Sequence, residues 1–232
     1  MKVVLINFSG NVGKSTLATN LLASRMNKPE RFQIESLNTG GDSEALKIKG
    51  ARFGQLVQSV MKADDAIIDV GASNVEDFID LMKQYEGSHE EFDYFLVPAV
   101  KEKKQQMDTI NTLKALVDIG VEPEKIRVVF NKLARDESPE EEFSALVGYA
   151  ASTGSFKYLP EAIVYENEIF ELLGGAGKSL HEVMADPVDY RERLRASKDE
   201  AERDLCVRMV GMKRLGATAT KNLDSTYQAL FA

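Results

Sequence analysis

The chain has 232 residues, of which 44% are hydrophobic, and a formal net charge of -8 at pH 7. No apolar run approaches the roughly 20 residues of a membrane-spanning helix, and the single cysteine, Cys206, excludes both an intrachain disulfide and a structural metal site built on cysteines. The negative charge argues against a protein that coats nucleic acid through bulk electrostatics. We therefore expect a cytoplasmic globular protein.

Short apolar runs alternate with helical patterns along most of the chain. The runs predict strands at Lys2–Asn7, Phe32–Leu37, Ala66–Val70, Tyr94–Pro98 and Ile126–Phe130, with Ala162–Tyr165 as an edge strand. Apolar residues at helical spacing predict helices at Lys14–Met26, Phe53–Met61, Val75–Tyr85 and Lys103–Ile119, and a helical turn at Glu168–Leu173. This order is typical of an α/β fold with a mostly parallel sheet and helices on both faces.

We expect one α/β domain over residues 1–188, with the acidic stretch Asp136–Glu142 as a solvated loop. Residues 189–232 should form a helical extension packed on the same domain. Its predicted apolar face consists of Leu194, Ala201, Leu205, Met209, Met212 and Leu215. Nine basic residues stand against five acidic ones between Tyr190 and Lys221, so any direct DNA contact is expected in this segment.

The strongest motif follows the first predicted strand and opens the first predicted helix. Its residues are Ser9, Gly10, Asn11, Val12, Gly13, Lys14, Ser15 and Thr16. A nucleoside triphosphate needs backbone N–H donors, a positive side chain and a hydroxyl that holds Mg²⁺. We assign these roles to the glycine turn, to Lys14 and to Ser15, with Thr16 donating to the inner phosphate. Phe8 stands where the strict phosphate-loop pattern has glycine, but the strand and helix around the motif support the interpretation.

Two further positions complete the predicted site. Asp69 ends a short buried strand and is the expected second Mg²⁺ ligand, although an aspartate there also suits a helix cap. Gly71 is a candidate N–H donor to the γ-phosphate. Asn131 and Lys132 follow a later strand, where the sheet edge would hold the base. A guanine reader of the form Asn-Lys-x-Asp has an acid where Ala134 stands, so we favour adenine and expect ATP as the nucleotide.

A second glycine-rich segment, from Gly174 to Ser179, repeats the spacing of the phosphate loop around Lys178. It follows a helical pattern instead of a buried strand, so no sheet edge would present a phosphate to it. We interpret it as a loop that terminates a helix.

The segment Gly10–Thr16 with Asn20 and Leu21 resembles the deviant Walker A motif of the ParA/MinD partition and positioning ATPases, and Ile67–Asp69 resembles their magnesium-side strand. The whole chain is similar to the StbB plasmid-stability proteins. The resemblance implies an ATP-dependent homodimer acting with a plasmid-encoded DNA-binding partner. It departs at two points: the signature lysine of the family falls at Ser9, and its second-strand aspartate falls near Leu37 or Asn38, with Glu35 and Asp42 the nearest acids. Hydrolysis is therefore expected to be weak or stimulated by a partner.

Three functions remain open. The first is an ATP-driven switch in plasmid partition, stability or conjugation, with Lys14 and Asp69 as catalytic residues. The second is a P-loop small-molecule kinase or ligase, for which the cluster Lys101, Lys103 and Lys104 is the local basic feature. The third is a nucleotide-sensing regulator that binds DNA through its basic tail, including Lys213 and Arg214, without hydrolysis.

Overall fold

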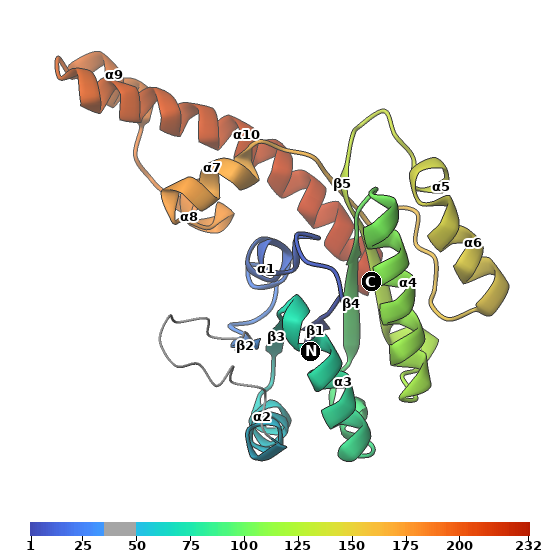
Figure 1. Ribbon diagram of the computed structural model, residues 1–232. Coiled ribbons are helices and arrows are strands. Elements are labelled where there is room, and N and C mark those ends of the chain that lie inside the picture. The colour runs from blue at the N-terminus through green and yellow to red at the C-terminus, as the bar shows by residue number, and fades with distance from the viewer. Residues whose placement is uncertain (35–49) are drawn as a thin grey trace, which may run out of the picture.

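A computed structural model describes residues 1–34 and 50–232, and within them six strands form one sheet in which every neighbouring pair is parallel (Figure 1). The strands are β1 (Lys2–Leu5), β2 (Glu30–Ile34), β3 (Ala66–Val70), β4 (Tyr94–Ala99), β5 (Ile126–Leu133) and β6 (Ile163–Tyr165). Their order across the sheet is β2-β3-β1-β4-β5-β6. The predicted α/β fold with a parallel sheet is thereby confirmed.

Residues of β1 and Ile6, which directly follows it, alternate between two hydrophobic cores because successive side chains of an extended chain point to opposite faces. Val4 and Ile6 belong to the core on one face, and Val3 and Leu5 to the core on the other. All four are fully buried. The central strand of the sheet is therefore covered on both sides, as a parallel sheet requires.

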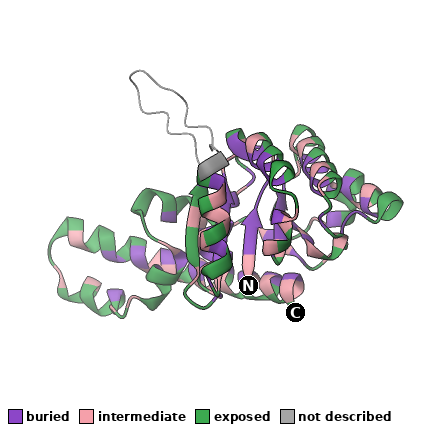
Figure 2. Ribbon diagram, turned by 90° about the horizontal axis from the view of Figure 1, so that it is seen from below, coloured by how far each residue is buried: buried purple, intermediate pink, exposed green. Residues whose placement is uncertain are grey.

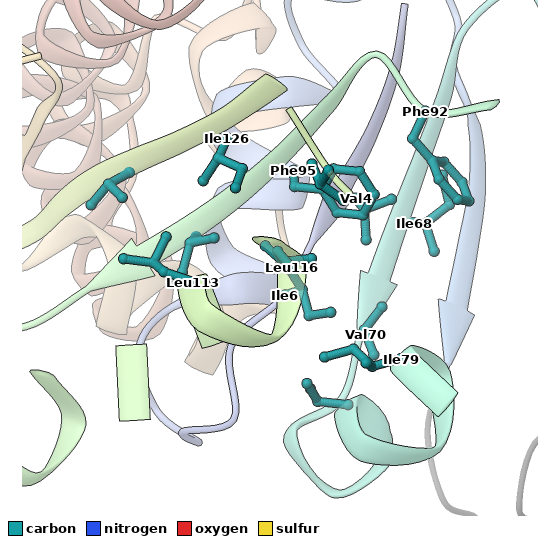
Figure 3. Packing of buried hydrophobic residues seen from close by; sticks show 14 of the residues in the cluster. Val4, Ile6, Ile68, Val70, Ile79, Phe92, Phe95, Leu113, Leu116 and Ile126 are labelled. Carbon is teal, nitrogen blue, oxygen red and sulfur yellow. The ribbon is translucent and has the colours of Figure 1, made fainter. Parts of the chain in front are cut away.

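Helices α2 (Gly50–Lys62), α3 (Val75–Gln84), α4 (Lys103–Asp118) and α6 (Ser144–Thr153) cover the first face. Figure 3 shows Leu113 and Leu116 of α4 packed near Ile126 of β5 and Ile6 beyond β1. Short helical turns η2 (Ala72–Asn74), η3 (Ser88–Glu91), η4 (Pro123–Lys125) and α5 (Pro139–Glu142) connect these elements.

The second face is covered by α1 (Lys14–Leu17), η1 (Ala18–Leu22), α7 (Ile169–Ala176), α8 (Leu180–Ala185) and α10 (Glu200–Phe231). Figure 1 shows α9 (Tyr190–Ala196) and the first half of α10 extending away from the sheet as an arm. Figure 2 shows that exposed residues dominate this arm, whereas the central strands β1, β3, β4 and β5 are mostly buried. Among the described helices, none is both long and apolar enough to cross a membrane.

The strand predicted at Phe32–Leu37 begins earlier, at Glu30, and the last three residues of that prediction lie outside the described residues. Two further predicted elements differ in type from those observed. The helix predicted over Lys14–Met26 is one α-helical turn followed by the π-helical turn η1. The guanidinium of Arg25, which follows η1, donates to the carbonyl oxygens of Asn20 and Leu21 in that turn. The predicted solvated loop Asp136–Glu142 contains the helical turn α5. Ser138 caps this turn by accepting from the Glu141 N–H, and proline follows at the first helical position.

The predicted apolar face of the C-terminal extension is partly wrong. Leu205 is 41% exposed, and the side chains that α10 buries include Cys206, Met209, Met212, Ala219, Leu223 and Leu230. Leu205, Met209 and Met212 lie in the same helix, so the buried stripe begins at Cys206 instead of Leu205 and continues through small and polar residues such as Gly216 and Thr226. Gly216 leaves room for α8 to pack closely on α10, because a Cβ at this position would lie 2.8 Å from the Met184 sulfur.

The second half of α10 is fixed to the edge of the sheet. Asn222 donates to the Ile163 carbonyl oxygen and accepts from the Tyr165 N–H, both at 2.9 Å. Its side-chain amide thus pairs with the backbone of β6 as another strand would, and it protects an edge that would otherwise be open to association. The Arg25 guanidinium also binds Asp224 at 2.7 Å, which ties α10 to the end of η1.

Candidate nucleotide-binding site

The predicted phosphate loop lies at the carboxyl end of β1, between β3 and β4 in the sheet. Parallel α/β sheets bind ligands at this edge, where the direction of the strand order changes. Asn11 has φ of 58° and Gly13 has φ of 91°, so both adopt the left-handed conformation. The chain then enters α1 at Lys14, which directs the first N–H groups of the helix toward the loop.

The two glycines of the loop have different roles. Gly13 is left-handed, and a Cβ on it would lie 2.4 Å from the Asn131 side-chain nitrogen. Gly10 is not left-handed, and a Cβ on it would meet no atom within 4 Å. Glycine is therefore required by the turn at Gly13, and Asn11 supplies the other left-handed residue, while the close approach of the Gly10 backbone to a phosphate stays a prediction.

Asn7, just before the loop, holds it to the sheet. Its side-chain nitrogen donates to the Pro98 carbonyl oxygen and to the Thr109 hydroxyl, each at 2.8 Å. Its side-chain oxygen accepts from the Ser9 N–H at 2.8 Å, and Thr112 accepts from the Phe8 N–H at 3.0 Å. Asn7 is fully buried, so these bonds satisfy a polar group that would otherwise be costly.

Lys14 is folded over its own loop. Its ammonium donates to the carbonyl oxygens of Asn7 at 3.0 Å and Ser9 at 2.7 Å, and only 7% of the residue is exposed. Burial lowers the pKa of Lys14 from 10.5 to about 8, whereas the charge of Asp69 raises it. Lys14 therefore lies within electrostatic range of the Asp69 carboxylate.

Asp69 pairs in register with Leu5, the last residue of β1, so its position is fixed by the sheet. Ser15 and Thr16 are exposed in the first turn of α1. A serine hydroxyl and a carboxylate are hard oxygen donors suited to Mg²⁺, which keeps waters and phosphate oxygens as its other ligands. No three His, Cys, Asp or Glu side chains gather as a possible metal site in residues 1–34 and 50–232. By their chemistry Ser15 and Asp69 are suitable Mg²⁺ donors, and the Mg²⁺ site itself stays a prediction.

Gly71 differs from its predicted role. Its N–H donates to the Ile34 carbonyl oxygen at 2.8 Å, which extends the pairing of β2 with β3. It therefore faces the neighbouring strand and has no N–H to offer a phosphate in this conformation. The positions expected near the second-strand aspartate, from Glu35 to Asp42, lie outside the described residues.

Asn131 and Lys132 both contact the phosphate loop. Asn131 donates to the Val12 carbonyl oxygen at 2.9 Å and lies against Gly13, while the Lys132 ammonium donates to the Asn11 carbonyl oxygen at 3.2 Å. Asn131 thus joins β5 to the loop. The sequence predicted a contact of Asn131 with the base and did not predict this structural role. The N–H of Ala134 is bound by Glu137, which also pairs with Lys101.

A cavity of about 620 Å³ opens beside the loop. Among its lining residues are Gly13, Thr16, Asn131, Lys132 and Tyr165. It is bounded by the ends of β5 and β6 and by α7, with the acids Glu102, Glu166, Glu168 and Glu171 on its wall. Its size is that of a small-molecule site. A larger groove of about 1,020 Å³ lies beside it and shares the wall from Tyr165 to Glu168.

The second glycine-rich segment is the end of a helix, as predicted. Gly177 has φ of 61° and terminates α7, and the Lys178 N–H bonds the Leu173 carbonyl oxygen. Ser179 then caps α8 together with Glu182 in a capping box. Lys178 is exposed.

The roles of Thr109, Thr112 and Asn20 were not predicted. Asn20 donates to the Thr16 carbonyl oxygen at 3.0 Å and accepts from the Leu180 N–H at 2.8 Å, which connects the phosphate loop helix to α8. Thr109 and Thr112 are both fully buried in α4. Polar residues on the helix face that is expected to be apolar were therefore the sequence signal that could have revealed them.

Comparison with known proteins adds evidence on the fold. No family model and no curated protein matches the chain. Among solved structures, apo McdA from Cyanothece matches with a TM-score of 0.51 and 16% identity over 92% of this chain and 98% of McdA. The MinD cell division protein of Aquifex aeolicus matches with a TM-score of 0.53 and 13% identity over 90% of this chain and 96% of MinD. The chain therefore has the fold of MinD and McdA, over nearly its whole length.

Proposed function

We propose that this chain binds ATP with Mg²⁺ and acts as a nucleotide-dependent switch in plasmid partition or stability, as an StbB-type member of the ParA/MinD deviant Walker A group. The observation that carries the proposal is the loop at the end of β1. Its left-handed Asn11 and Gly13 lead into a helix whose first residues are Lys14, Ser15 and Thr16. The fold that the chain shares with MinD and McdA supports the proposal.

In this proposal the loop N–H groups and the N-terminus of α1 bind the phosphates. Lys14 leaves the two carbonyl oxygens that it now bonds and reaches the terminal phosphates. Ser15 and Asp69 hold Mg²⁺, which neutralises phosphate charge when bound. Asn131 keeps the loop against β5, and the adenine lies in the adjoining cavity.

Turnover is proposed to be weak or stimulated by a partner. Ser9 is 8% exposed and carries no charge, so it cannot reach the phosphates of a second subunit as the family's signature lysine does. Binding and release of the nucleotide then set the state of the switch, with hydrolysis as a slow or stimulated step.

The proposed assembly is a homodimer that works with a plasmid-encoded DNA-binding protein, with direct DNA contact through the α9–α10 arm. The arm exposes Arg191, Arg195, Lys198, Arg203, Arg208 and Arg214. Lys213 is not available in the same way. Its ammonium donates to the Asp186 and Val188 carbonyl oxygens and lies 5.2 Å from the Tyr190 ring centre. A DNA-binding test should therefore neutralise Arg208 and Arg214 instead of Lys213.

A kinase or ligase has less support. Of the basic cluster considered for a second substrate, Lys101 pairs with Glu137 at 2.7 Å, and this hydrogen bond raises the pKa of Lys101. Its charge is compensated within the protein, and it is not presented to a substrate.

The proposal is tested by ATP turnover and mass measurement in solution, with and without double-stranded DNA. We expect slow Mg²⁺-dependent turnover and a shift from monomer to dimer on addition of ATP. Asp69→Asn should suppress the Mg²⁺ dependence of both. Turnover that rises only with an added small metabolite, with no change in mass, would support the kinase or ligase instead.

A further inference from the structure

Lys132 stands in an unusual backbone position at the end of β5. It has φ of 58°, one of three left-handed residues other than glycine in the described chain. The pairing of β5 with β6 shifts register between Asn131 and Leu133, so Lys132 occupies a bulge. Bulges turn a side chain away from its regular direction and are frequent beside functional sites. Here the result is that the Lys132 ammonium reaches the Asn11 carbonyl oxygen at 3.2 Å.

Acidic side chains dominate the charge on the wall of the cavity beside the loop. Among the described residues that line it, Lys132 is the single lysine or arginine, whereas Glu102, Glu166, Glu168 and Glu171 are four acids. A nucleoside triphosphate brings further negative charge, and the loop itself contributes one cation, Lys14. A second cation close to the loop would offset part of this repulsion.

Two neighbouring cations are already engaged within the protein. Lys101 pairs with Glu137 at 2.7 Å, and the Arg135 guanidinium lies over the Tyr165 ring at 5.0 Å. Lys132 instead donates to a neutral carbonyl oxygen, and its residue is exposed. Such a bond is readily exchanged for a charge-assisted bond to phosphate, which is stronger.

We propose that Lys132 is a phosphate-binding residue that supplies, within the same subunit, the second positive charge that Ser9 does not provide. The inference rests on the proposed nucleotide function and assigns a further residue to that site. Asn131 holds the end of β5 against Val12, so the ammonium is positioned at the tip of the loop before the ligand arrives. On binding, Lys132 moves from the Asn11 carbonyl oxygen to the phosphate chain.

The test is the affinity of ATP, ADP and AMP, each with Mg²⁺, measured by calorimetry for four proteins. These are the wild type, Lys132→Asn, Lys132→Arg and the control Lys157→Asn, which neutralises an exposed lysine outside the cavity lining. Asparagine suits the left-handed backbone at 132, so the first variant removes the charge without adding strain. Thermal unfolding of each variant checks that the fold is retained.

We expect Lys132→Asn to weaken ATP about tenfold and AMP less, because one charge-assisted hydrogen bond to the outer phosphates is lost. Lys132→Arg should restore most of the affinity, and Lys157→Asn should match the wild type. An equal loss for all three nucleotides, or no loss for ATP, would overturn the role of Lys132 while leaving the nucleotide site in place. A wild type that binds none of them would instead overturn the proposed function itself.

Discussion

The Asn131 side-chain nitrogen occupies the space that a Cβ on Gly13 would need, since the two atoms would be 2.4 Å apart. The same nitrogen donates to the Val12 carbonyl oxygen at 2.9 Å. The end of β5 and the turn of the loop therefore pack against each other, although Gly13 and Asn131 are 118 positions apart in the sequence. The shape of the loop depends on this contact as well as on its own sequence.

Because of this contact, alanine is expected to destabilise the protein at Gly13 but not at Gly10. Gly13→Ala should lower the free energy of unfolding by about 1–3 kcal/mol, because alanine is strained at φ of 91° and clashes with Asn131. Gly10→Ala should leave stability nearly unchanged, since the space around Gly10 is open. Urea unfolding of both variants measures the difference, and equal midpoints for the two would refute the assigned geometry.

ATP binding should depend on pH through Lys14. Its pKa in the free protein is about 8 because burial favours the neutral form, so it is protonated below that pH and loses its proton above it. A phosphate chain binds the protonated form, so ATP affinity should be constant below pH 7 and fall by up to about tenfold per pH unit above pH 8. Titrations between pH 6.5 and 9.5 measure this. The Lys14→Ala variant is the control and should bind weakly with no break near pH 8.

The lowered pKa of Lys14 has the opposite effect on the stability of the fold, which should rise with pH where ATP affinity falls. The unfolded chain holds the Lys14 proton up to about pH 10.5, whereas the folded chain releases it near pH 8. Lys14 therefore contributes stability that increases as pH rises between these values, because the unfolded state binds more protons there. In the difference between wild type and Lys14→Ala, the free energy of unfolding should rise between pH 8 and 10. A difference that stays flat would contradict the lowered pKa.

Asn7 is expected to matter for the stability of the loop. Asn7→Ala removes side-chain bonds to Pro98, Thr109 and Ser9 in a fully buried position, which should cost about 2–3 kcal/mol. Asn27→Ala, at an exposed position, is the matched control and should cost little. Chemical unfolding compares the two, and a cost no larger at Asn7 than at Asn27 would show that these bonds do not stabilise the fold.

Asn222 is expected to hold α10 on the sheet edge. Asn222→Ala leaves the Tyr165 N–H without its partner and removes a donor from Ile163, at a cost of about 1–2 kcal/mol. Ser225→Ala lies on the same helix at an exposed position and serves as the control. Amide hydrogen exchange gives a local readout, because the Tyr165 amide should exchange faster in the first variant alone. Unchanged protection there would remove the assigned role.

The sequence predicted the buried parts of the fold best. The strand at Ala66–Val70 was predicted with its observed bounds, since all five residues are buried and a glycine follows at once. A turn at Ser9–Thr16 before a helix was also expected from the sequence and is observed, and its phosphate-binding role stays a prediction. The face of α10 was not, because its buried side includes small and polar residues such as Gly216 and Thr226 that pack through neighbours distant in sequence.

The candidate site likewise contains residues that the sequence could predict and residues that it could not. Lys14, Ser15 and Asp69 follow a pattern that links residue type to phosphate and magnesium chemistry. Asn7 satisfies a buried carbonyl 91 residues away, and no local pattern reveals such a partner. The strained position of Lys132 arises from a bulge between β5 and β6, a property of strand pairing that appears only in three dimensions.

The central claim is that the loop at the end of β1 binds ATP, and the chain contains its own control for it. Lys14 and Lys178 both follow a glycine and precede a serine, but the loop before Lys14 follows the central strand β1, whereas Lys178 follows the helix α7. Calorimetric titration of Mg²⁺ and ATP into the wild type, Lys14→Ala and Lys178→Ala tests this difference directly. The account predicts that Lys14→Ala loses at least about tenfold in affinity, as for one strong charge-assisted contact, while Lys178→Ala binds as the wild type does. Unchanged affinity in Lys14→Ala, or a loss confined to Lys178→Ala, would contradict it.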